Sequence, residues 1–487
     1  MKTRRPPADQ RLLPSDSSPA TFWVTNPDNV VRDNVAAGSD GHGFWLAFPE
    51  HPTGLFAATF PTENQAIWPR RTPLGEFSGN VAHSNGGDGL HVDSGPRPDG
   101  QTETSHHHAR ANPADTGSAS VTTEFGRFAG YKNRHRAVWL RGTGHRLTGA
   151  VLADNAVGAT FASHESFLQD SLLVGETANK GAPTQYETDR GRVGRDGRSL
   201  PRPWDSSFPI RGYEFYDGRV GAERTSFVNF QPYVTPSGQA RQQSALGYNL
   251  TNHFSIHPRN FATALRFVNA NRVHLPDLVV GYDGDASSVF LDTDGSVTGT
   301  AGRTVASNNP FLLGASCAPK AEWNAHVCDG DYATLSVGTG DGEPAAIKPL
   351  RLTRADGRIQ TLMGSQSDST RAHSSVLTNS RYGVEYNGAT PQRARFVLSR
   401  GRDRWVQLNV SRAEGFRVTR YGCNVGDPAK YCYGAAASLA ALASATKSSY
   451  WYDNRGDADP ATGTLHLKLV SNGTDYEELK AEPPPAP

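Results

Sequence analysis

Five ionisable side chains in the first half of the chain could together perform acid–base chemistry on an anionic substrate. Asp154, Glu176 and Asp217 offer carboxyl groups, which can donate a proton, accept one or attack as nucleophiles. Lys132 and Arg211 offer positive charge, and the planar guanidinium of Arg211 matches the geometry of a carboxylate. The sequence therefore predicts an acid–base site with cations beside it, provided that the fold brings these residues together.

A repeated segment places some of these residues in register. NVAHSNGGDGLHV at 80–92 repeats NVAAGSDGHGFWL at 34–46, and looser copies are YKNRHRAVWL at 131–140 and LADNAVGATF at 152–161. One column of this alignment, the asparagine column, contains Ser39, Asn85, Asn133 and Asn155. The column before it contains Gly38, Ser84, Lys132 and Asp154. A repeated strand–turn unit predicts a solenoid of stacked strands.

The distance between the last two copies indicates the size of one coil. Asn133 and Asn155 are separated by 22 residues, which suits a three-sided parallel β-helix. Asparagine tolerates the left-handed conformation of a tight turn, and its amide can bond to the next asparagine in a stack. The asparagine column is therefore interpreted as scaffold, although Asn133 is kept as a candidate substrate contact.

The neighbouring column changes residue type from coil to coil. Stacked coils place equivalent residues about 4.8 Å apart, so Lys132 and Asp154 form either a weak surface ion pair or one edge of a binding groove. His83 is either a turn-packing residue or a base. Asp217 precedes a glycine, so turn formation and catalysis are both open for it.

Composition favours many short strands over long helices. The 487 residues include 50 glycines and 32 prolines, and an elongated solenoid can accommodate this length. We predict a disordered tail at 1–19, a right-handed parallel β-helix with loop insertions at 20–365, a β-sandwich-like domain at 370–475 and a second tail at 476–487. The second domain is expected to contain one helix, Ala435 to Thr446, which is rich in alanine.

Several classes of function are disfavoured. A formal net charge of +1 gives no overall field to attract nucleic acid or anionic lipid. The sequence contains no apolar run long enough to span a membrane, and the first 20 residues lack the apolar core of a signal peptide. Either export uses a segment missing from this chain, or the chain is a piece of a longer protein. GxSxG, P-loop, HExxH and paired CxxC motifs are absent from the sequence.

The cysteines and two clusters raise further possibilities. Cys317 with Cys328 and Cys423 with Cys432 form two close pairs, which favour local disulfides over a metal site, although four unrelated buried thiols remain an alternative. The three histidines at 106–108 could hold a metal, but their loop is of low complexity. Four carboxylates at alternate positions could bind Ca²⁺ or could cap two Asp-Gly turns; they are Asp283, Asp285, Asp292 and Asp294.

Ordered blocks along the chain resemble a known family. The matching blocks are NPDNVVRDNVAAGSDGHGFWL, PLGEFSGNVAHSNGG, AGYKNRHRAVWLRG, QDSLLVGETANKG, FPIRGYEFYDG, VFLDTDGSVTG and SSYWYDNRGDADPATGTLHLKL. They are similar to the hyaluronan-binding, cell-migration-inducing proteins and cell-surface hyaluronidases, with fibrocystin-like proteins more distant. The resemblance implies a right-handed parallel β-helix followed by a β-sandwich-like domain, at the cell surface or outside the cell. The family's glycine-containing N-terminal domain has no counterpart in these blocks.

The resemblance also implies a substrate, namely hyaluronan or a related uronic-acid polysaccharide. On that expectation, Asp154 and Glu176 act as acid and as nucleophile or base, with Asp217 and His83 as further catalytic candidates. Substrate contacts are expected from Lys132, Arg211, Tyr216, Asn133 and His135. Two alternatives remain open: a non-catalytic binding or adhesion module, and a uronic-acid lyase that uses Ca²⁺. A surface scaffold without a groove is a third.

Overall fold

The computed structural model describes residues 3–177, 185, 208–234, 238–249, 256–277, 287–340, 343, 347–363, 370–420, 433–454, 463–471 and 475–484. These residues form two compact units, which are described separately. The first unit comprises residues 1–249, 261–274 and 292–301. The second comprises residues 250–260, 275–291 and 302–487.

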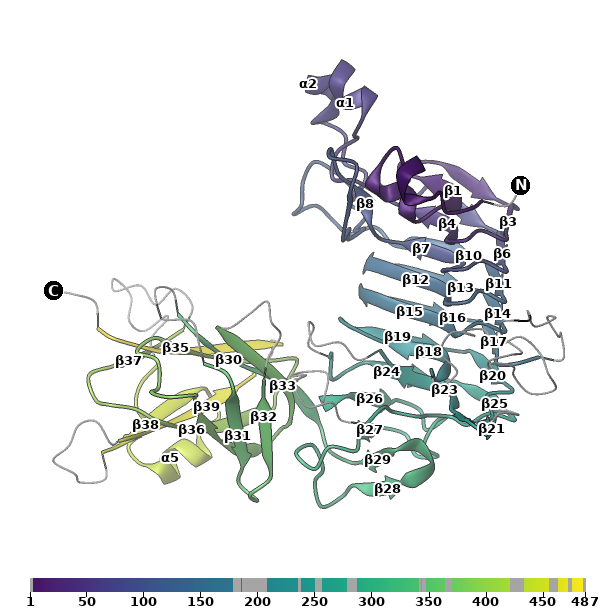
Figure 1. Ribbon diagram of the computed structural model, residues 1–487. Helices are drawn as coiled ribbons and strands as arrows, with labels where there is room; N and C mark the ends of the chain where they lie inside the picture. Colours follow the sequence, from purple (N-terminus) through teal and green to yellow (C-terminus); the bar gives the residue numbers. More distant parts are fainter. Residues whose placement is uncertain are drawn as a thin grey trace. The chain divides into compact units, whose positions relative to one another are not determined.

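The first unit is a parallel β-helix whose coils each contribute one strand to three sheets (Figure 1). Sheet A consists of β1 (Ala20–Val24), β4 (His42–Leu46), β7 (Leu90–Val92), β12 (Arg136–Thr143), β15 (Val157–His164), β18 (Ile210–Phe215) and β23 (Gln243–Tyr248). Sheet B contains β2 (Val30–Arg32), β5 (Glu76–Ser78), β10 (Thr123–Gly126), β13 (His145–Thr148), β16 (Ser166–Gln169), β19 (Val220–Glu223) and β24 (Phe261–Thr263). Sheet C contains β3 (Val35–Ala37), β6 (Val81–His83), β11 (Ala129–Tyr131), β14 (Val151–Ala153), β17 (Leu172–Val174), β20 (Ser226–Val228) and β25 (Arg266–Val268).

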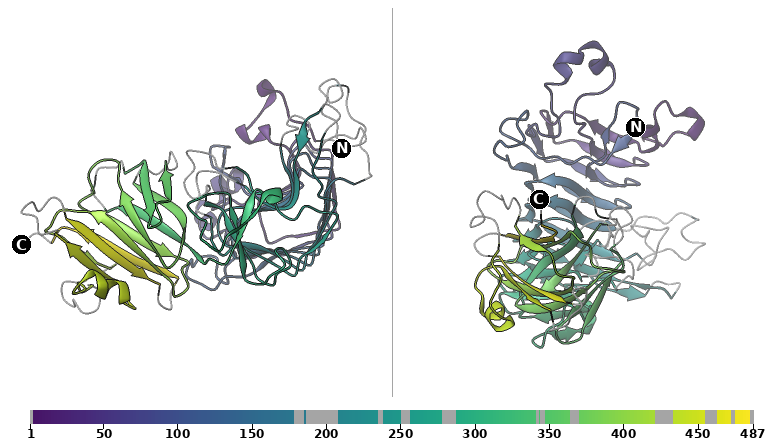
Figure 2. Two further views of the ribbon diagram at one scale, coloured as in Figure 1. Left: turned by 90° about the horizontal axis from the view of Figure 1, so that it is seen from below. Right: turned by 90° about the vertical axis from the view of Figure 1, so that its left-hand side faces the viewer.

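The register of the strands confirms the predicted coil. Val138 pairs with Ala159, 21 positions later, and Thr123 pairs with His145, 22 positions later. Seen along the stack, the strands of successive coils lie over one another (Figure 2, left). Because side chains alternate across a strand, one set fills the interior, where Phe44 is fully buried in the core. The predicted all-β parallel β-helix is thus confirmed.

Glycine is required at two positions where neighbouring coils approach closely. A Cβ atom on Gly43 would lie 2.6 Å from the carbonyl oxygen of Gly89, and one on Gly89 would lie 2.7 Å from the carbonyl oxygen of Ala137. Glycine is therefore needed at both positions for steric reasons. This observation explains the glycines at or next to the start of β4 and β7 in the repeat.

The asparagine column forms the predicted ladder. The side-chain amide of Asn85 donates to Asn133 Oδ1 at 2.9 Å, and the amide of Asn133 donates to Asn155 Oδ1 at 3.0 Å. The left-handed conformation that we assigned to the asparagines belongs instead to the residues before them. Ser84, Lys132 and Asp154 have φ values of 57°, 56° and 55°. The asparagine side chains thus stabilise a turn whose left-handed residue is their neighbour.

Insertions leave the coils at defined places. The first carries two short helices, α1 (Leu55–Thr59) and α2 (Pro61–Asn64), and the second carries the hairpin of β8 (Gly95–Pro96) with β9 (Thr102–Glu103). A further hairpin joins β21 (Tyr233–Val234) to β22 (Ala240–Arg241). The coils therefore keep a nearly fixed length while the loops vary.

The second unit contains β26 (Val289–Asp292), β27 (Arg303–Ser307), β28 (Ala318–Lys320) and β29 (Ala325–Cys328), followed by two further sheets. One has the order β33 (Arg371–Leu377), β30 (Tyr332–Thr339), β35 (Ala394–Ser399), β40 (Tyr476–Glu482), β37 (Arg417–Thr419). The other has the order β32 (Ile359–Leu362), β31 (Leu350–Arg354), β34 (Ser380–Glu385), β36 (Trp405–Ser411), β39 (Thr464–Val470), β38 (Ser449–Asp453). Leu335 and Phe396 of the first sheet share one buried core with Leu408 and Leu467 of the second. These sheets include strands on both sides of residue 370.

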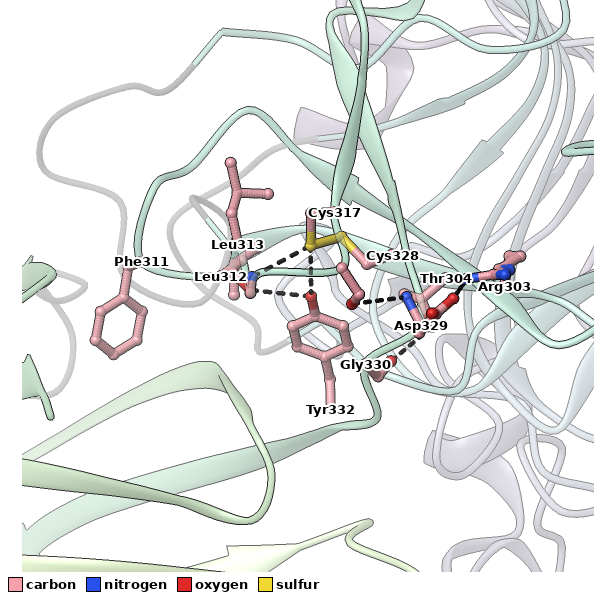
Figure 3. Close-up of a disulfide and its surroundings, with 12 residues drawn as sticks. Arg303, Thr304, Phe311, Leu312, Leu313, Cys317, Cys328, Asp329, Gly330 and Tyr332 are labelled. Atoms are coloured by element: carbon pink, nitrogen blue, oxygen red, sulfur yellow. Dashed lines mark hydrogen bonds and ion pairs between the residues drawn. A yellow bond between two sulfur atoms is a disulfide. The ribbon is translucent and has the colours of Figure 1, made fainter. Parts of the chain in front are cut away.

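One of the two predicted disulfides lies within the described residues. Cys317 and Cys328 are bonded, and Tyr332 lies beside them (Figure 3). The Gly314 amide donates to Cys317 Sγ at 3.2 Å. Tyr332 Oη donates to the carbonyl of Leu312 at 2.9 Å. The first pairing is thus confirmed. Cys423 and Cys432 lie outside the described residues.

The predicted helix of the second domain is shorter than expected. It appears as α5 (Leu439–Ser444), and the Ser438 hydroxyl caps it by accepting from the Ala441 amide at 3.1 Å. In the described parts of the chain, no helix has the length and apolar character needed to cross a membrane.

Candidate functional site

Sheet A presents a row of aromatic rings on its outer face. The strand register aligns Trp23, Trp45, His91 and Trp139 on successive strands. Neighbouring ring centroids are 6.2 Å, 6.3 Å and 6.4 Å apart. Because the inward residues alternate with these rings, the row points away from the core. We call these four residues the aromatic ladder; it runs across the strands, along the β-helix axis.

Asp93 directly follows β7, at the edge of sheet A where the strands end. Its carboxylate is fixed there by four hydrogen bonds. Its Oδ1 accepts from the backbone amides of Ser94 and Ser105, at 2.6 Å and 3.0 Å. Its Oδ2 accepts from Trp139 Nε1 at 3.0 Å and from Arg141 Nε at 2.7 Å. The pKa of Asp93 is lowered, since Arg141 and these bonds outweigh the opposing effect of burial. Asp93 is therefore an anchor that orients Trp139 and Arg141.

Asp217 lies on the other side of Arg141. Its Oδ2 is 3.9 Å from Arg141 Nη1, and its Oδ1 is buried without a hydrogen-bond partner among the described residues. Burial raises the pKa of Asp217 to about 6, Arg141 opposes this shift and the charge of Asp93 adds to it. The neighbouring Tyr216 ring is 5.7 Å from Trp139. Near neutral pH, Asp217 is thus a carboxyl group that can hold and release a proton.

A second group of charged side chains spans the neighbouring strands β12, β15 and β18 of sheet A. Glu214, which is almost fully buried, makes a short contact with Arg211 Nη1, accepts from Thr160 Oγ1 at 2.7 Å and lies 3.5 Å from Arg136 Nη2. Burial opposes ionisation of Glu214, but the two arginines lower its pKa overall. Arg211, predicted as a uronate clamp, is therefore paired with a carboxylate of its own strand. It has 7 % of its surface exposed.

A cluster of histidines surrounds Asp88 at the edge of sheet A where strands β4, β7 and β12 begin. His91 Nδ1 is 2.8 Å and His42 Nδ1 is 3.7 Å from Asp88 Oδ2, while His135 Nδ1 is 2.9 Å from Oδ1. Burial lowers the pKa of His42 to about 3, and the proximity of His91 adds to this effect. Burial opposes ionisation of Asp88, yet His135 and His91 hold its pKa well below the usual range. The cluster borders a pocket of about 320 Å³, which also contains Trp45.

The residues predicted from the column of changing residue type lie elsewhere, in the turn that joins sheet C to sheet A. Asp154 accepts hydrogen bonds from the amide and hydroxyl of Thr177, at 2.7 Å and 2.6 Å. Glu176 Oε1 accepts from Tyr233 Oη at 2.9 Å. From Val157 to Ser163 alone, β15 extends for about 20 Å. Asp154 and Asp217 therefore lie at opposite edges of sheet A and cannot share one glycosidic bond.

His83 and Lys132 belong to the same turn region as Asp154. The His83 ring stacks on Tyr131 at 4.7 Å, with an interplanar angle of 3°. Burial and the nearby Lys132 charge lower the pKa of His83. Asn133 is fully buried, and its side-chain amide donates to Asn155 and to the Ala82 carbonyl in the asparagine column. These contacts indicate a structural role for Asn133. Of the predicted substrate contacts, Arg211, Tyr216 and His135 lie on or beside the outer face of sheet A.

The predicted calcium ligands that can be described are already hydrogen-bonded. Asp292 Oδ2 accepts from the amides of Val297 and Thr298, at 3.2 Å and 2.7 Å. Asp294 accepts from the Ser296 hydroxyl at 2.8 Å and from the Ala264 amide at 2.8 Å. Both aspartates therefore act as turn caps. Asp283 and Asp285 lie outside the described residues.

The sequence reasoning missed Asp93, Arg141, Trp139 and Glu214, and it also missed the cluster of His42, Asp88 and His91. The repeat contained a signal for the cluster. Asp-Gly pairs in both copies are followed by histidines, in DGHG and DGLH. Phe44 pairs with Leu90 in the neighbouring coil. The same register, continued two positions towards the N-terminus, places His42 opposite Asp88.

Comparison with known proteins finds relatives over much of the chain. The family described as CEMIP beta-helix matches residues 3–90. The human protein named cell surface hyaluronidase CEMIP2 is 29% identical over 428 residues, which are 80% of this chain and 30% of that protein. The mouse cell migration-inducing and hyaluronan-binding protein is 31% identical over 346 residues, 65% of this chain and 25% of that protein. A zebrafish cell surface hyaluronidase is 27% identical over 422 residues, 80% of this chain and 29% of that protein.

The chain therefore spans between a quarter and a third of the length of these relatives. The family match covers the first coils of the β-helix, including β1 and β4 of sheet A, and the longer matches cover up to 80% of the chain. Taken with the fold, these matches show that the chain is similar to the CEMIP family of β-helix proteins.

Proposed function

We propose that this protein binds a uronic-acid polysaccharide, with hyaluronan as the first candidate, on the outer face of sheet A and hydrolyses its glycosidic bonds. The observation that carries the proposal is the arrangement of Trp139 and Tyr216 beside Arg141 and the proton-holding Asp217. The names of the relatives, which include hyaluronan binding and hyaluronidase, support the choice of polymer.

Binding would use the arginines and the accessible rings of the aromatic ladder, mainly Trp23, which is 51% exposed, and Trp139, since Trp45 is only 5% exposed. Aromatic rings offer flat apolar surface for sugar faces. The guanidinium groups of Arg136 and Arg141 lie 4.8 Å and 5.4 Å from the centroid of the Trp139 ring. An arginine next to an aromatic ring can hold a uronate carboxylate while the ring covers the sugar. A linear polymer would thus run along the ladder and across the strands.

Cleavage would use Asp217 as the general acid. In its protonated form, Asp217 would donate its proton to the glycosidic oxygen as the bond to that oxygen breaks. Asp93, which contacts Arg141 from the other side, would keep a fixed negative charge near the developing positive charge on the sugar. A water molecule would then bond to the anomeric carbon and give a proton to the Asp217 carboxylate, which completes hydrolysis and restores the acid. Arg141 positions both carboxyl groups and the substrate.

The proposal is tested by incubating the protein with high-molecular-weight hyaluronan and following polymer size and binding. The wild type is expected to bind and shorten the polymer, and Asp217→Asn is expected to bind it without shortening it. Asp170→Asn is the matched control, because Asp170 pairs with Arg224 on an exposed turn away from sheet A. A polymer that is neither bound nor shortened by the wild type would contradict the proposal.

Binding without cleavage is the second candidate function. It is favoured by the four hydrogen bonds of Asp93, which leave this carboxylate firmly engaged. In that case the wild type and Asp217→Asn would bind equally and leave polymer size unchanged. Ultraviolet absorbance from an unsaturated uronate in the product would instead indicate a lyase.

We infer that the protein works outside the cell or at its surface. The disulfide between Cys317 and Cys328 is typical of an oxidising compartment. The relatives named as cell surface hyaluronidases agree with this location. This location is tested by measuring the amount of the protein in the culture medium and on the surface of intact cells.

A further inference from the structure

We propose that His42, Asp88 and His91 form a binding site for a divalent transition-metal ion, for which zinc is the best-matched ion. The three residues come from two neighbouring coils: His42 begins β4, Asp88 precedes β7, and His91 is the middle residue of β7. This site uses none of Asp93, Arg141 and Asp217, although it shares His91 with the aromatic ladder, and metal binding to it does not depend on the function proposed above.

The ligand atoms converge on one point. One nitrogen or oxygen atom from each residue lies within 4.8 Å of the other two, and among the described residues this is the group of three metal-ligating side chains with that property. The Nδ1 atoms of His91 and His42 are 2.8 Å and 3.7 Å from Asp88 Oδ2. Bonds from zinc to nitrogen and oxygen of about 2.0–2.2 Å separate tetrahedral ligands by about 3.3 Å. An ion therefore needs only small side-chain movements.

Two hydrogen bonds orient the carboxylate of Asp88. Its Oδ1 accepts from the Arg136 amide at 3.1 Å and is 2.9 Å from His135 Nδ1. These partners hold Oδ2 towards His42 and His91. Bonds from neighbouring residues to the second oxygen of a ligand are typical of metal sites. Ion binding through His42 Nδ1 would replace the 3.3 Å bond that this atom accepts from the Asp88 amide.

The site is open on one side. His42 and His91 line the pocket of about 320 Å³, together with Trp45, Ser15, Ser18 and Gln101. An ion bound by three protein atoms would therefore keep at least one position for water or a ligand, as catalytic zinc sites do. The side chains of His42 and His91 are 16% and 14% exposed, which is enough for an ion to enter from the pocket.

The ligand types determine which ions fit. Two imidazole nitrogens with one carboxylate suit zinc and other first-row transition metals. Calcium and magnesium prefer sites built from oxygen atoms. The site should therefore bind Zn²⁺ and Co²⁺ and should discriminate against Ca²⁺.

The test begins with protein that has been stripped of metal by a chelator. Zn²⁺ titration against a chromophoric competitor is expected to show one site per chain, with an affinity at least 100-fold above that for Ca²⁺. His42→Ala and His91→Ala should each weaken this site at least tenfold. His164→Ala is the matched control, because His164 is half-exposed at the end of β15 and should leave Zn²⁺ affinity unchanged. Thermal unfolding of each variant checks that it folds.

A measurement on the wild type keeps the proposal testable if a variant does not fold. Diffraction from zinc-soaked crystals, collected at the zinc absorption edge, should place an anomalous peak between His42, Asp88 and His91. A peak elsewhere, for instance at the histidines of 106–108, would overturn the proposal. Unchanged Zn²⁺ affinity in both alanine variants, or no Zn²⁺ binding by the wild type, would also overturn it.

Discussion

Two regions of the β-helix carry ionisable residues, and they differ in what holds those residues in place. The turn between sheets C and A presents Ser84, Lys132 and Asp154 at left-handed positions, one per coil. The outer face of sheet A presents Asp93, Arg141 and Asp217 on or directly after extended strands. In the turn, the backbone conformation defines the column. On the sheet, side chains contact one another across coils.

This difference shows why variation along a repeat is weak evidence for a site. A left-handed turn position accepts glycine and, at some energetic cost, several polar residues. Its residue type can therefore change from coil to coil without any role in binding. On the sheet, Asp93 accepts hydrogen bonds from two side chains of another coil, Trp139 and Arg141. Mutual dependence of that kind distinguishes an organised site from a tolerant position.

The largest expected difference between the two regions is in catalysis. Asp217→Asn should lower the rate of hyaluronan depolymerisation by about 10²–10⁴-fold, because it removes the general acid. Asp154→Asn should change that rate by less than about threefold, since Asp154 bonds to Thr177 at the far edge of the sheet. Initial rates from the change in polymer size measure both. The reverse order would assign the chemistry to the turn.

Substrate affinity should separate the regions next. Arg141→Gln should weaken hyaluronan binding by about 10–100-fold, since a hydrogen bond to a charged group contributes about 1.5–3 kcal/mol. Lys132→Gln should weaken binding by less than about twofold. Titration with defined oligosaccharides at two salt concentrations measures the affinities, and Arg224→Gln controls for loss of a surface charge. Equal losses at 141 and 132 would indicate a groove that reaches the turn.

The pH dependence should follow Asp217. Its pKa is raised from 3.8 to about 6, so the protonated acid is lost as pH rises through 6. The depolymerisation rate should then fall about tenfold per pH unit above that point. Between about pH 4 and 6, the folded protein retains a proton that the unfolded chain has released, so stability should decline as pH rises. Rate profiles and denaturant titrations measure these effects, and Asp217→Asn should abolish the decline in stability.

The smallest expected effects concern stability alone. Asn133→Ala should lower the free energy of unfolding by about 1–3 kcal/mol, because Asn85 loses its acceptor and Asn155 loses its donor inside the coil. Lys132→Gly should change it by less than about 1 kcal/mol, since glycine adopts a φ of 56° without strain but costs entropy. Denaturant unfolding of the two variants compares them. An unchanged free energy of unfolding in Asn133→Ala would contradict the stabilising role of the asparagine column.

Much of the fold could be predicted from the repeat. The spacing of Asn133 and Asn155 gave the coil length, and the asparagine ladder followed from the chemistry of amides that stack. The left-handed residue of the turn was assigned one position too late, since asparagine composition does not reveal which residue of a turn adopts a positive φ. Of the predicted site residues, Arg211, Tyr216 and Asp217 lie on or at the end of sheet A, whereas Asp154, Lys132 and His83 lie in the turn region.

The sequence by itself determined that this chain repeats a strand–turn unit, that the unit stacks in parallel and that the chain resembles a family with a β-helix. These properties depend on local patterns, because each coil contacts mainly its neighbours. Only the tertiary structure decided which polar residues meet. Asp93, Arg141 and Asp217 are separated by 48 and 76 positions, and His42 lies 46 positions before Asp88. Because insertions of unequal length separate the coils, the residues in contact are not a constant number of positions apart in the sequence. The register of the strands brings these residues together.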